Sequence, residues 1–194
     1  MYNKIKVFIP IILLFLTLTG CRVVFYDESL QSQPLNSKKS EEVTLEGTVF
    51  IERARLIIRG TTNLPKGTII LAGLKEFSKN ATITDIFEGN EQVSGDFVEE
   101  YKVEVDDTGQ FTIVINKKQA TMSSQLEVWF RPNLQINTLQ EKFGRTGEFL
   151  AEVEGLENYE FEGESFSGLV KYAPILDGGG KWKLAPSLTL SRPM

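Results

Sequence analysis

The chain has 194 residues, with 21 Lys or Arg and 26 Asp or Glu, which gives a formal net charge of −5 at neutral pH. This balance argues against a nucleic-acid partner, because proteins that bind nucleic acids carry basic surfaces. The chain contains no histidine, which excludes Ser-His-Asp and Cys-His catalysis and the usual histidine-bearing zinc sites. It has a single cysteine, so no disulfide forms within it.

The N-terminal segment has the layout of a secretory signal. Lys4 and Lys6 precede an apolar run from Val7 to Leu18, the charged-then-apolar order of a signal peptide. The run has 12 residues, includes Pro10, and is shorter than the about 20 residues that a spanning helix needs. We therefore expect residues 1–20 to be a signal peptide, the alternative being an uncleaved anchor or a buried core helix.

The only cysteine, Cys21, closes this segment in the sequence Leu18-Thr19-Gly20-Cys21. The motif resembles the lipobox of bacterial lipoproteins, whose cysteine is lipidated and becomes the new N-terminus. The resemblance implies palmitate-type acylation of Cys21 and a place on the extracytoplasmic face of the cell membrane. Residues 21–42 are mostly polar after their first few positions, which predicts an acylated cysteine followed by a flexible tether.

From residue 43 to residue 194, the dominant pattern is alternation of apolar and polar residues, which is typical of half-buried strands. The clearest alternating runs are 54–59, 101–105, 111–115 and 126–131. Turn signals separate them, including Leu64–Gly67 and Asp106–Gly109, where Gly109 suits the left-handed position of a bulged hairpin. We predict one all-β domain, an immunoglobulin-like β-sandwich of seven to nine strands.

One stretch near 138–150 breaks the alternation. Thr138-Leu139-Gln140-Glu141 has the form of a helix capping box, and Leu139, Phe143 and Leu150 fall on one helical stripe. Two glycines at 144 and 147 would each cost about 1 kcal/mol within a helix. We expect one short helix here that covers an end or edge of the sheets.

Motifs that resemble catalytic or ligand sites are incomplete. Gly163–Ser167 lacks the last glycine of a G-x-S-x-G elbow, and we expect a loop there. Gly178–Lys181 is followed by Trp182 and by no helix pattern, whereas a P-loop needs Ser or Thr after its lysine and then a helix; we expect a hairpin loop. Asp106-Asp107 and the acidic stretch 85–96 offer oxygen ligands for calcium, but solvated turns explain them better. We therefore assign no catalytic residue, metal or cofactor.

Two tryptophans are candidates for ligand contact. Trp129 alternates opposite to Val128 and Phe130 and lies beside Glu127 and Arg131, so it is a candidate for carbohydrate stacking or a protein contact on an outer face. The interpretation that we favour is structural, with the second sheet covering Trp129 and with Trp182 plugging one end of the sandwich.

Four phrases together resemble one group of proteins: Gly60–Thr68, Val105–Phe111, Arg131–Gln135 and Phe143–Glu148. In this combination the chain is similar to uncharacterised bacterial lipoproteins, mainly of Bacillus-like organisms, that have an immunoglobulin-like sandwich outside the membrane. The resemblance implies a fold and a location, and it brings no catalytic residues with it.

These observations favour a membrane-anchored lipoprotein of the cell envelope whose sandwich is a non-catalytic binding or spacer module for envelope proteins or cell-wall glycan. The alternative is an envelope hydrolase that depends on carboxylates or a divalent ion. A transporter's solute receptor is disfavoured, because such receptors usually need two lobes around a cleft.

Overall fold

The computed structural model describes residues 40–190, except 92, 94, 117–122 and 177–178. The chain divides into a unit of residues 1–37 and a unit of residues 38–194, and the fold below is that of the second unit. Cys21 and the predicted signal peptide lie outside the described residues.

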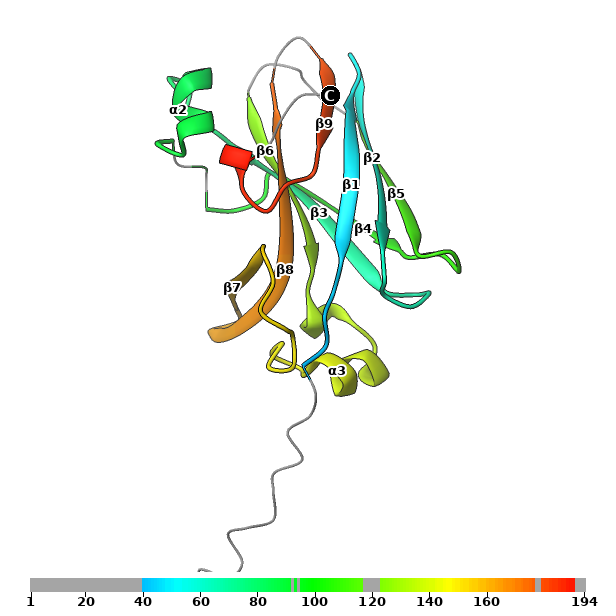
Figure 1. The fold of residues 1–194 in the computed structure, drawn as a ribbon. Coiled ribbons are helices and arrows are strands. Elements are labelled where there is room, and N and C mark those ends of the chain that lie inside the picture. The colour runs from blue at the N-terminus through cyan, green and yellow to red at the C-terminus, as the bar shows by residue number, and fades with distance from the viewer. Residues whose placement is uncertain (1–39, 92, 94, 117–122, 177–178, 191–194) are drawn as a thin grey trace, which may run out of the picture. The chain divides into compact units, whose positions relative to one another are not determined.

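Within these described residues, nine strands form two antiparallel sheets that pack face to face (Figure 1). The four-stranded sheet has the order β5-β2-β1-β9, and the five-stranded sheet has the order β4-β3-β6-β8-β7. The bounds of the first five strands are Leu45–Ile51 (β1), Arg55–Thr62 (β2), Ile69–Glu76 (β3), Glu99–Glu104 (β4) and Gln110–Asn116 (β5). Those of the remaining strands are Ser124–Phe130 (β6), Leu156–Phe161 (β7), Glu164–Ile175 (β8) and Gly180–Lys183 (β9). The predicted all-β sandwich of seven to nine strands is confirmed.

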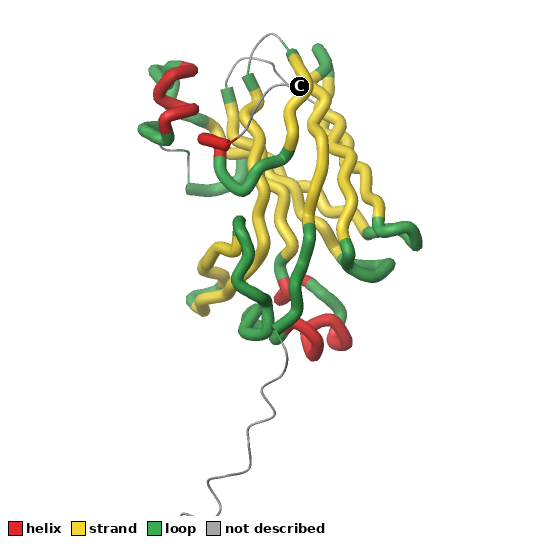
Figure 2. The backbone as a smooth tube through the Cα atoms, in the orientation of Figure 1, coloured by secondary structure: helices red, strands yellow, loops and turns green. Residues whose placement is uncertain are grey.

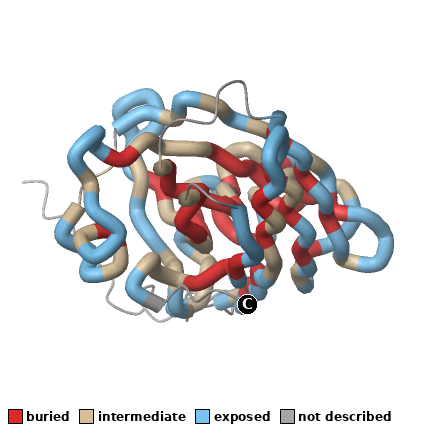
Figure 3. The backbone as a smooth tube through the Cα atoms, turned by 90° about the horizontal axis from the view of Figure 1, so that it is seen from above, coloured by how far each residue is buried: buried red, intermediate tan, exposed pale blue. Residues whose placement is uncertain are grey.

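The core lies between the two sheets, and Figure 3 shows the buried residues along the strands that enclose it. Val49, Leu56 and Ile58 come from the four-stranded sheet, and Val128 and Phe130 come from the five-stranded sheet; each of these side chains has 0% exposure. Because side chains in a strand alternate between the two faces, the same strands present their other residues on outer faces.

The helix expected near 138–150 is α3, Asn137–Phe143, which lies at one end of the strands (Figure 2). Leu139 and Phe143 are buried, as the helical stripe predicts. The predicted cap is wrong, because the N-cap is Ile136 and Thr138 lies inside the helix. The helix ends at Gly144, whose φ of 82° lies in the left-handed region that glycine tolerates.

A side-chain N-cap does occur elsewhere, at the start of the short helix α2, Ile83–Glu88. The hydroxyl oxygen of its N-cap, Thr82, accepts a hydrogen bond from the N–H of Asp85 at 3.1 Å and donates one to the Asp85 carboxylate. Single-turn 3-10 helices follow at Pro132–Leu134 and Leu188–Leu190. In the described part of the chain, no helix combines the length and apolar character needed to cross a bilayer.

The turn Asp106–Gly109 does not form the predicted hairpin. Gly109 has the expected left-handed φ of 76°, but β4 pairs with β3 and β5 pairs with β2. The turn therefore carries the chain from one sheet to the other. The link from β8 to β9 also joins the two sheets, so the glycine-rich stretch before Lys181 does not connect a hairpin either.

The stretch Gly163–Ser167 belongs to a true hairpin between β7 and β8. Glu162 and Gly163 form its two-residue loop, with φ values of 52° and 80°, as a type I′ turn requires. Ser165 pairs with Glu160 within the ladder, so the residue lies in a strand rather than on a catalytic elbow.

Candidate functional site

The outer face of the five-stranded sheet carries a second buried cluster, formed by Leu71, Trp129 and Val170. These three residues lie opposite one another in the register of β3, β6 and β8. Trp129 therefore faces away from the second sheet, as its alternation indicates, yet it is only 4% exposed. Partly buried side chains pack against the cluster on this face: Phe97, Leu134, Tyr159 and Tyr172.

This arrangement corrects the expectation for Trp129, because side chains on its own outer face cover it and the second sheet does not. Trp182 belongs to the main core and is 8% exposed. Its ring stacks on Phe87 at 5.6 Å between centroids. The interpretation of Trp182 as a core side chain is thus supported.

A buried carboxylate lies at the centre of the outer face. Glu127 is 3% exposed and is two residues from both Gln125 and Trp129, which places all three on one face of β6. Its Oε2 accepts a hydrogen bond from the indole N–H of Trp129 at 2.8 Å. Its Oε1 accepts one from Nε2 of Gln125 at 2.8 Å and lies 3.0 Å from Nζ of Lys75. Since a buried charge costs several kcal/mol unless it is paired, these three donors hold Glu127 in place.

Arg131 follows Trp129 at the next two-residue step. Its guanidinium carbon lies 4.6 Å from the ring centre of Trp129, 4.5 Å from that of Tyr159 and 5.6 Å from that of Phe97. Burial lowers the pKa of Arg131, and the nearby Tyr159, Glu100 and Glu127 oppose this effect. The Nε atom is buried without a hydrogen-bond partner among the described residues, and such a donor costs about 1–3 kcal/mol.

These groups line a hollow of about 360 Å³, a volume within the range of small-ligand sites. The residues around it come from β3, the segment 95–97, β6, β7 and β8: Lys75, Gly95, Asp96, Phe97, Glu127, Trp129, Arg131, Glu157, Asn158, Tyr159, Glu160 and Tyr172. Phe97 lies on the backbone of Gly73, where an added Cβ would be 2.3 Å from its ring. The absence of a side chain at Gly73 therefore positions Phe97 on this face.

The two tyrosines of the hollow keep their protons well above neutral pH. Burial raises the pKa of Tyr159 to about 12, against the opposing effect of Arg131. Burial, followed by a hydrogen bond to Glu157, raises the pKa of Tyr172. Both phenols are therefore neutral hydroxyl groups under physiological conditions. Together with the amide of Asn158, they make the hollow rich in uncharged donors and acceptors.

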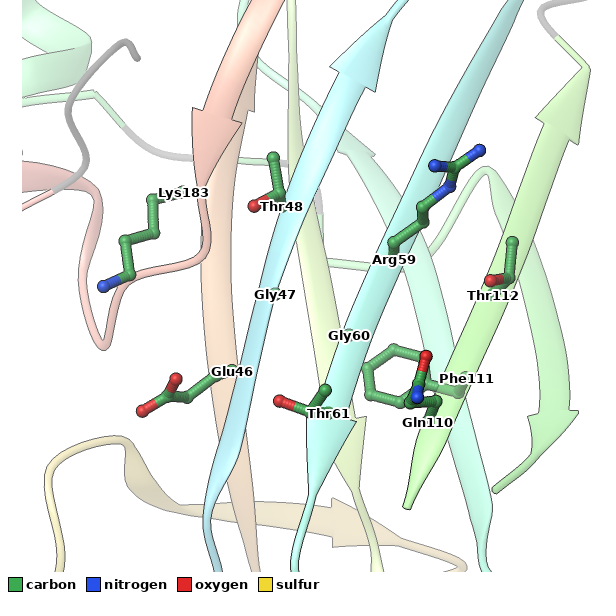
Figure 4. Close-up of a pocket in the computed structure, with 10 residues that line it drawn as sticks. All are labelled: Glu46, Gly47, Thr48, Arg59, Gly60, Thr61, Gln110, Phe111, Thr112 and Lys183. Atoms are coloured by element: carbon green, nitrogen blue, oxygen red, sulfur yellow. The ribbon is translucent and has the colours of Figure 1, made fainter. Parts of the chain in front are cut away.

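A second hollow, of about 300 Å³, lies on the outer face of the four-stranded sheet (Figure 4). Its floor includes Gly47 and Gly60, which lie opposite each other across β1 and β2. Arg59 and Lys183 border it, and both are exposed. We take the first hollow as the candidate site, because it holds the buried carboxylate of Glu127 and the guanidinium of Arg131, which lies over three aromatic rings.

The acidic stretches noted in the sequence use their carboxylates in local structure. Oδ1 of Asp106 accepts three hydrogen bonds, from the N–H and the hydroxyl of Thr108 and from the N–H of Gln110. Asp85 accepts a hydrogen bond from the hydroxyl of Thr82, the N-cap of α2, and Glu88 accepts one from Asn90. Over the described ranges, no group of three or more Cys, Asp or Glu side chains is placed to hold a metal ion.

The sequence pattern indicated Trp129 as a candidate contact residue, but it did not predict the other residues of the site. Lys75, Tyr159 and Tyr172 come from three other strands, and their approach depends on strand order. One sequence feature could have indicated the site. Gln125, Glu127 and Arg131 lie at two-residue steps from Trp129, and β6 is buried on both faces. Comparison with protein-family models, with curated proteins and with solved structures finds no match to this chain.

Proposed function

We propose that this chain is a lipid-anchored protein of the bacterial cell envelope whose sandwich is a non-catalytic binding module. The N-terminal layout and the Leu18–Cys21 motif support the anchor, with acylated Cys21 in the extracytoplasmic leaflet. The tether is the predicted segment after Cys21 up to Glu41, where the backbone pairs with Phe149 and Ala151 of the domain. The resemblance to Bacillus-like lipoproteins with an immunoglobulin-like domain agrees with this proposal.

The ligand that we favour is a neutral glycan of the cell wall, bound in the hollow around Glu127 and Arg131. The buried charged network on an outer sheet face is the observation that carries this proposal. The sandwich already has a core between its sheets, and desolvating these charges on an outer face costs free energy. Natural proteins depart from the usual rules of folding mainly at functional sites. A buried charged network on an outer sheet face is such a departure.

The chemistry of the hollow suits hydroxyl groups. Carboxylates accept from sugar hydroxyls, and Arg131 donates to them. The phenol hydrogens of Tyr159 and Tyr172 are bound to Asn133 and Glu157, respectively, so the phenol oxygens act as acceptors. The partly exposed rings of Phe97 and Tyr159 provide apolar contact. Four acidic residues line the hollow against one lysine and one arginine. This excess of negative charge favours an uncharged ligand over an anionic one.

The alternative, a carboxylate-dependent hydrolase, is less well supported by this geometry. A glycosidase needs one carboxyl that delivers a proton and a second that acts as base or nucleophile. Both oxygens of Glu127 already accept hydrogen bonds from neighbouring side chains. Such a carboxylate orients its neighbours and is poorly placed to attack a substrate or to exchange protons with it.

The binding role is tested with the full chain in detergent micelles and purified insoluble cell-wall glycan, by co-sedimentation. We expect the unaltered chain to sediment with the glycan. Arg131→Lys keeps the charge but loses the planar guanidinium and should weaken binding at least tenfold, or about 1.4 kcal/mol. Arg59→Lys makes the same change on the opposite face and should bind normally. Failure of the unaltered chain to bind, or equal loss in both variants, refutes the glycan ligand, while release of reducing sugars would favour the hydrolase.

The anchor is tested separately, by labelling cells with radioactive palmitate. Cys21→Ala should abolish incorporation of the label and release the chain from the membrane fraction. Cys21→Ser, which retains a similar size, should behave in the same way. Continued membrane association of both variants, or retention of residues 1–20 with a free thiol, would refute lipid anchoring.

A further inference from the structure

Four strands lie at the edges of the two sheets, and three of them are protected. Unpaired backbone groups at an edge invite a further strand, and charged side chains or a short length prevent this. Strand β9 has four residues, two of them lysines; β4 carries three glutamates and a lysine; β7 carries two glutamates. Strand β5, Gln110–Asn116, carries no charged residue, proline or glycine over its seven residues.

The open part of this edge can be located from the hydrogen bonds. The N–H of Thr62 donates to the carbonyl of Gly109 at 2.8 Å. Because the bonding direction alternates along an antiparallel strand, Phe111, Ile113 and Ile115 direct their backbone groups toward β2. The backbone groups of Thr112, Val114 and Asn116 therefore point away from the sheet.

The backbone groups of Gln110 also point away from the sheet, but Asp106 forms hydrogen bonds with both of them. The N–H of Gln110 donates to Oδ1 of Asp106 at 2.9 Å, and its carbonyl accepts from the N–H of Asp106 at 2.9 Å. Among the residues that the structure describes, the open edge thus begins after Gln110 and contains three outward-facing residues, at 112, 114 and 116. Val114 lies at their centre.

The side chain of Val114 ends an apolar row on the outer face. Val114 lies opposite Ile57, and Ile57 lies opposite Phe50. Val114 is 45% exposed. A neighbouring strand with an apolar residue at the matching position would continue this row and cover Val114.

We propose that the edge of β5 pairs antiparallel with β5 of a second copy of this chain, with Val114 on the two-fold axis. Val114 then lies opposite its own counterpart, and Thr112 lies opposite Asn116 of the second copy. This register uses both backbone groups of all three open residues in each copy. It also brings the two apolar rows together without placing like charges opposite each other.

The composition of the edge suits a second copy of the chain. A two-fold interface must be self-complementary, and none of the seven residues of β5 carries a charge that its counterpart would repel. The inward-facing residues also match, because Ile113 lies opposite Ile115 of the second copy. The proposal is independent of the hollow around Glu127 and of the lipid anchor, which involve other parts of the chain.

Cysteine crosslinking tests the register in the full chain, purified in detergent micelles. In a hydrogen-bonded antiparallel pair the Cα atoms are about 5.5 Å apart, within the range of a disulfide. Val114→Cys, in the processed chain whose Cys21 is acylated, should therefore give a crosslinked species of twice the mass of the single chain on mild oxidation. Thr112→Cys is the matched control, since the two copies of residue 112 would be four residues out of register, about 14 Å apart.

A charge at the axis provides the second test. Val114→Lys places two ammonium groups opposite each other and should convert the dimer to single chains, as measured by light scattering corrected for detergent. Val98→Lys adds the same charge at a site with 51% exposure outside β5 and should leave the dimer intact. Single chains for the unaltered protein, crosslinking of Val114→Cys no faster than that of Thr112→Cys, or pairing of this edge with a different protein would each overturn the proposal.

Discussion

The indole N–H of Trp129 donates to Oε2 of Glu127 on the outer face of the five-stranded sheet, over 2.8 Å. This hydrogen bond joins an apolar cluster to a charged network, since Trp129 packs on Leu71 while Glu127 pairs with Lys75. Arg131 lies over the same indole ring. Strand β6 and the residue that follows it thereby supply the central groups of the candidate site.

The pairing of Lys75 with Glu127 should contribute measurably to stability. Their side chains are 21% and 4% exposed and 3.0 Å apart. Lys75→Met removes one donor from a buried carboxylate, and we expect it to lower the free energy of unfolding by about 2 kcal/mol. Urea unfolding of the full chain in detergent, followed by tryptophan fluorescence, provides the measurement.

The exposed pair of Arg145 and Glu164 is the control for that measurement. Its side chains are 63% and 56% exposed at a distance of 2.7 Å, and exposed pairs contribute about 0–1 kcal/mol. Arg145→Met should therefore change stability by less than about 1 kcal/mol. Equal effects of the two substitutions would show that burial does not strengthen the Lys75 pair.

Asp106 should make the turn between β4 and β5 sensitive to acid. Its pKa is lowered, chiefly by the hydroxyl of Thr108 and then by the N–H of Gln110. A folded-state pKa below the unfolded value gives stability that is present above the unfolded value and is lost as the pH falls through the folded value. Asp106→Asn keeps the Oδ1 acceptor but removes the titration, so the stability difference from the unaltered chain should disappear at low pH.

Urea unfolding between neutral pH and about pH 3, below the unfolded carboxyl pKa, measures this dependence. Asp107→Asn removes the same charge at the next position and should leave the acid dependence close to that of the unaltered chain. An identical acid response of the two variants would mean that the hydrogen bonds of the turn do not stabilise the Asp106 carboxylate.

Alternation along the chain was sufficient to predict the sandwich, because strands such as Gln110–Asn116 have a strict two-residue burial pattern. It could not predict which strands pair. The turn at Asp106–Gly109 reverses the chain in the way that the sequence indicates, but the chain then enters the other sheet. A local turn motif fixes backbone conformation over a few residues, whereas the choice of pairing partner depends on packing of the whole domain.

The candidate site illustrates the same limit. Strand β6 is buried at every position, so polar residues on its outer face do not stand out as solvated ones. Phe97 reaches the site from a loop, and its place depends on Gly73 in a different strand. Such approaches between distant segments cannot be obtained from the spacing of residues within one strand.

Tyr159 should ionise far above the usual range for tyrosine. Burial raises its pKa from 10.0 to about 12, which gives stability that is fully present below the unfolded value and is lost as the pH rises through the folded value. The phenolate absorbance of the unaltered chain minus that of Tyr159→Phe isolates this residue. We expect a midpoint near the raised value, whereas ionisation at the ordinary tyrosine pKa would show that the ring is not buried in solution.

The hairpin between β7 and β8 allows backbone strain to be measured apart from steric conflict. An added Cβ at Gly163 or at Gly95 meets no atom within 4 Å, but only Gly163 has a φ in the left-handed region, at 80°. Gly163→Ala should therefore lower the free energy of unfolding by about 1–2 kcal/mol. Gly95→Ala should be neutral or stabilise by up to about 1 kcal/mol, because alanine restricts the unfolded chain. Since neither substitution creates a contact, equal unfolding midpoints in urea for the two variants would exclude the left-handed conformation at Gly163.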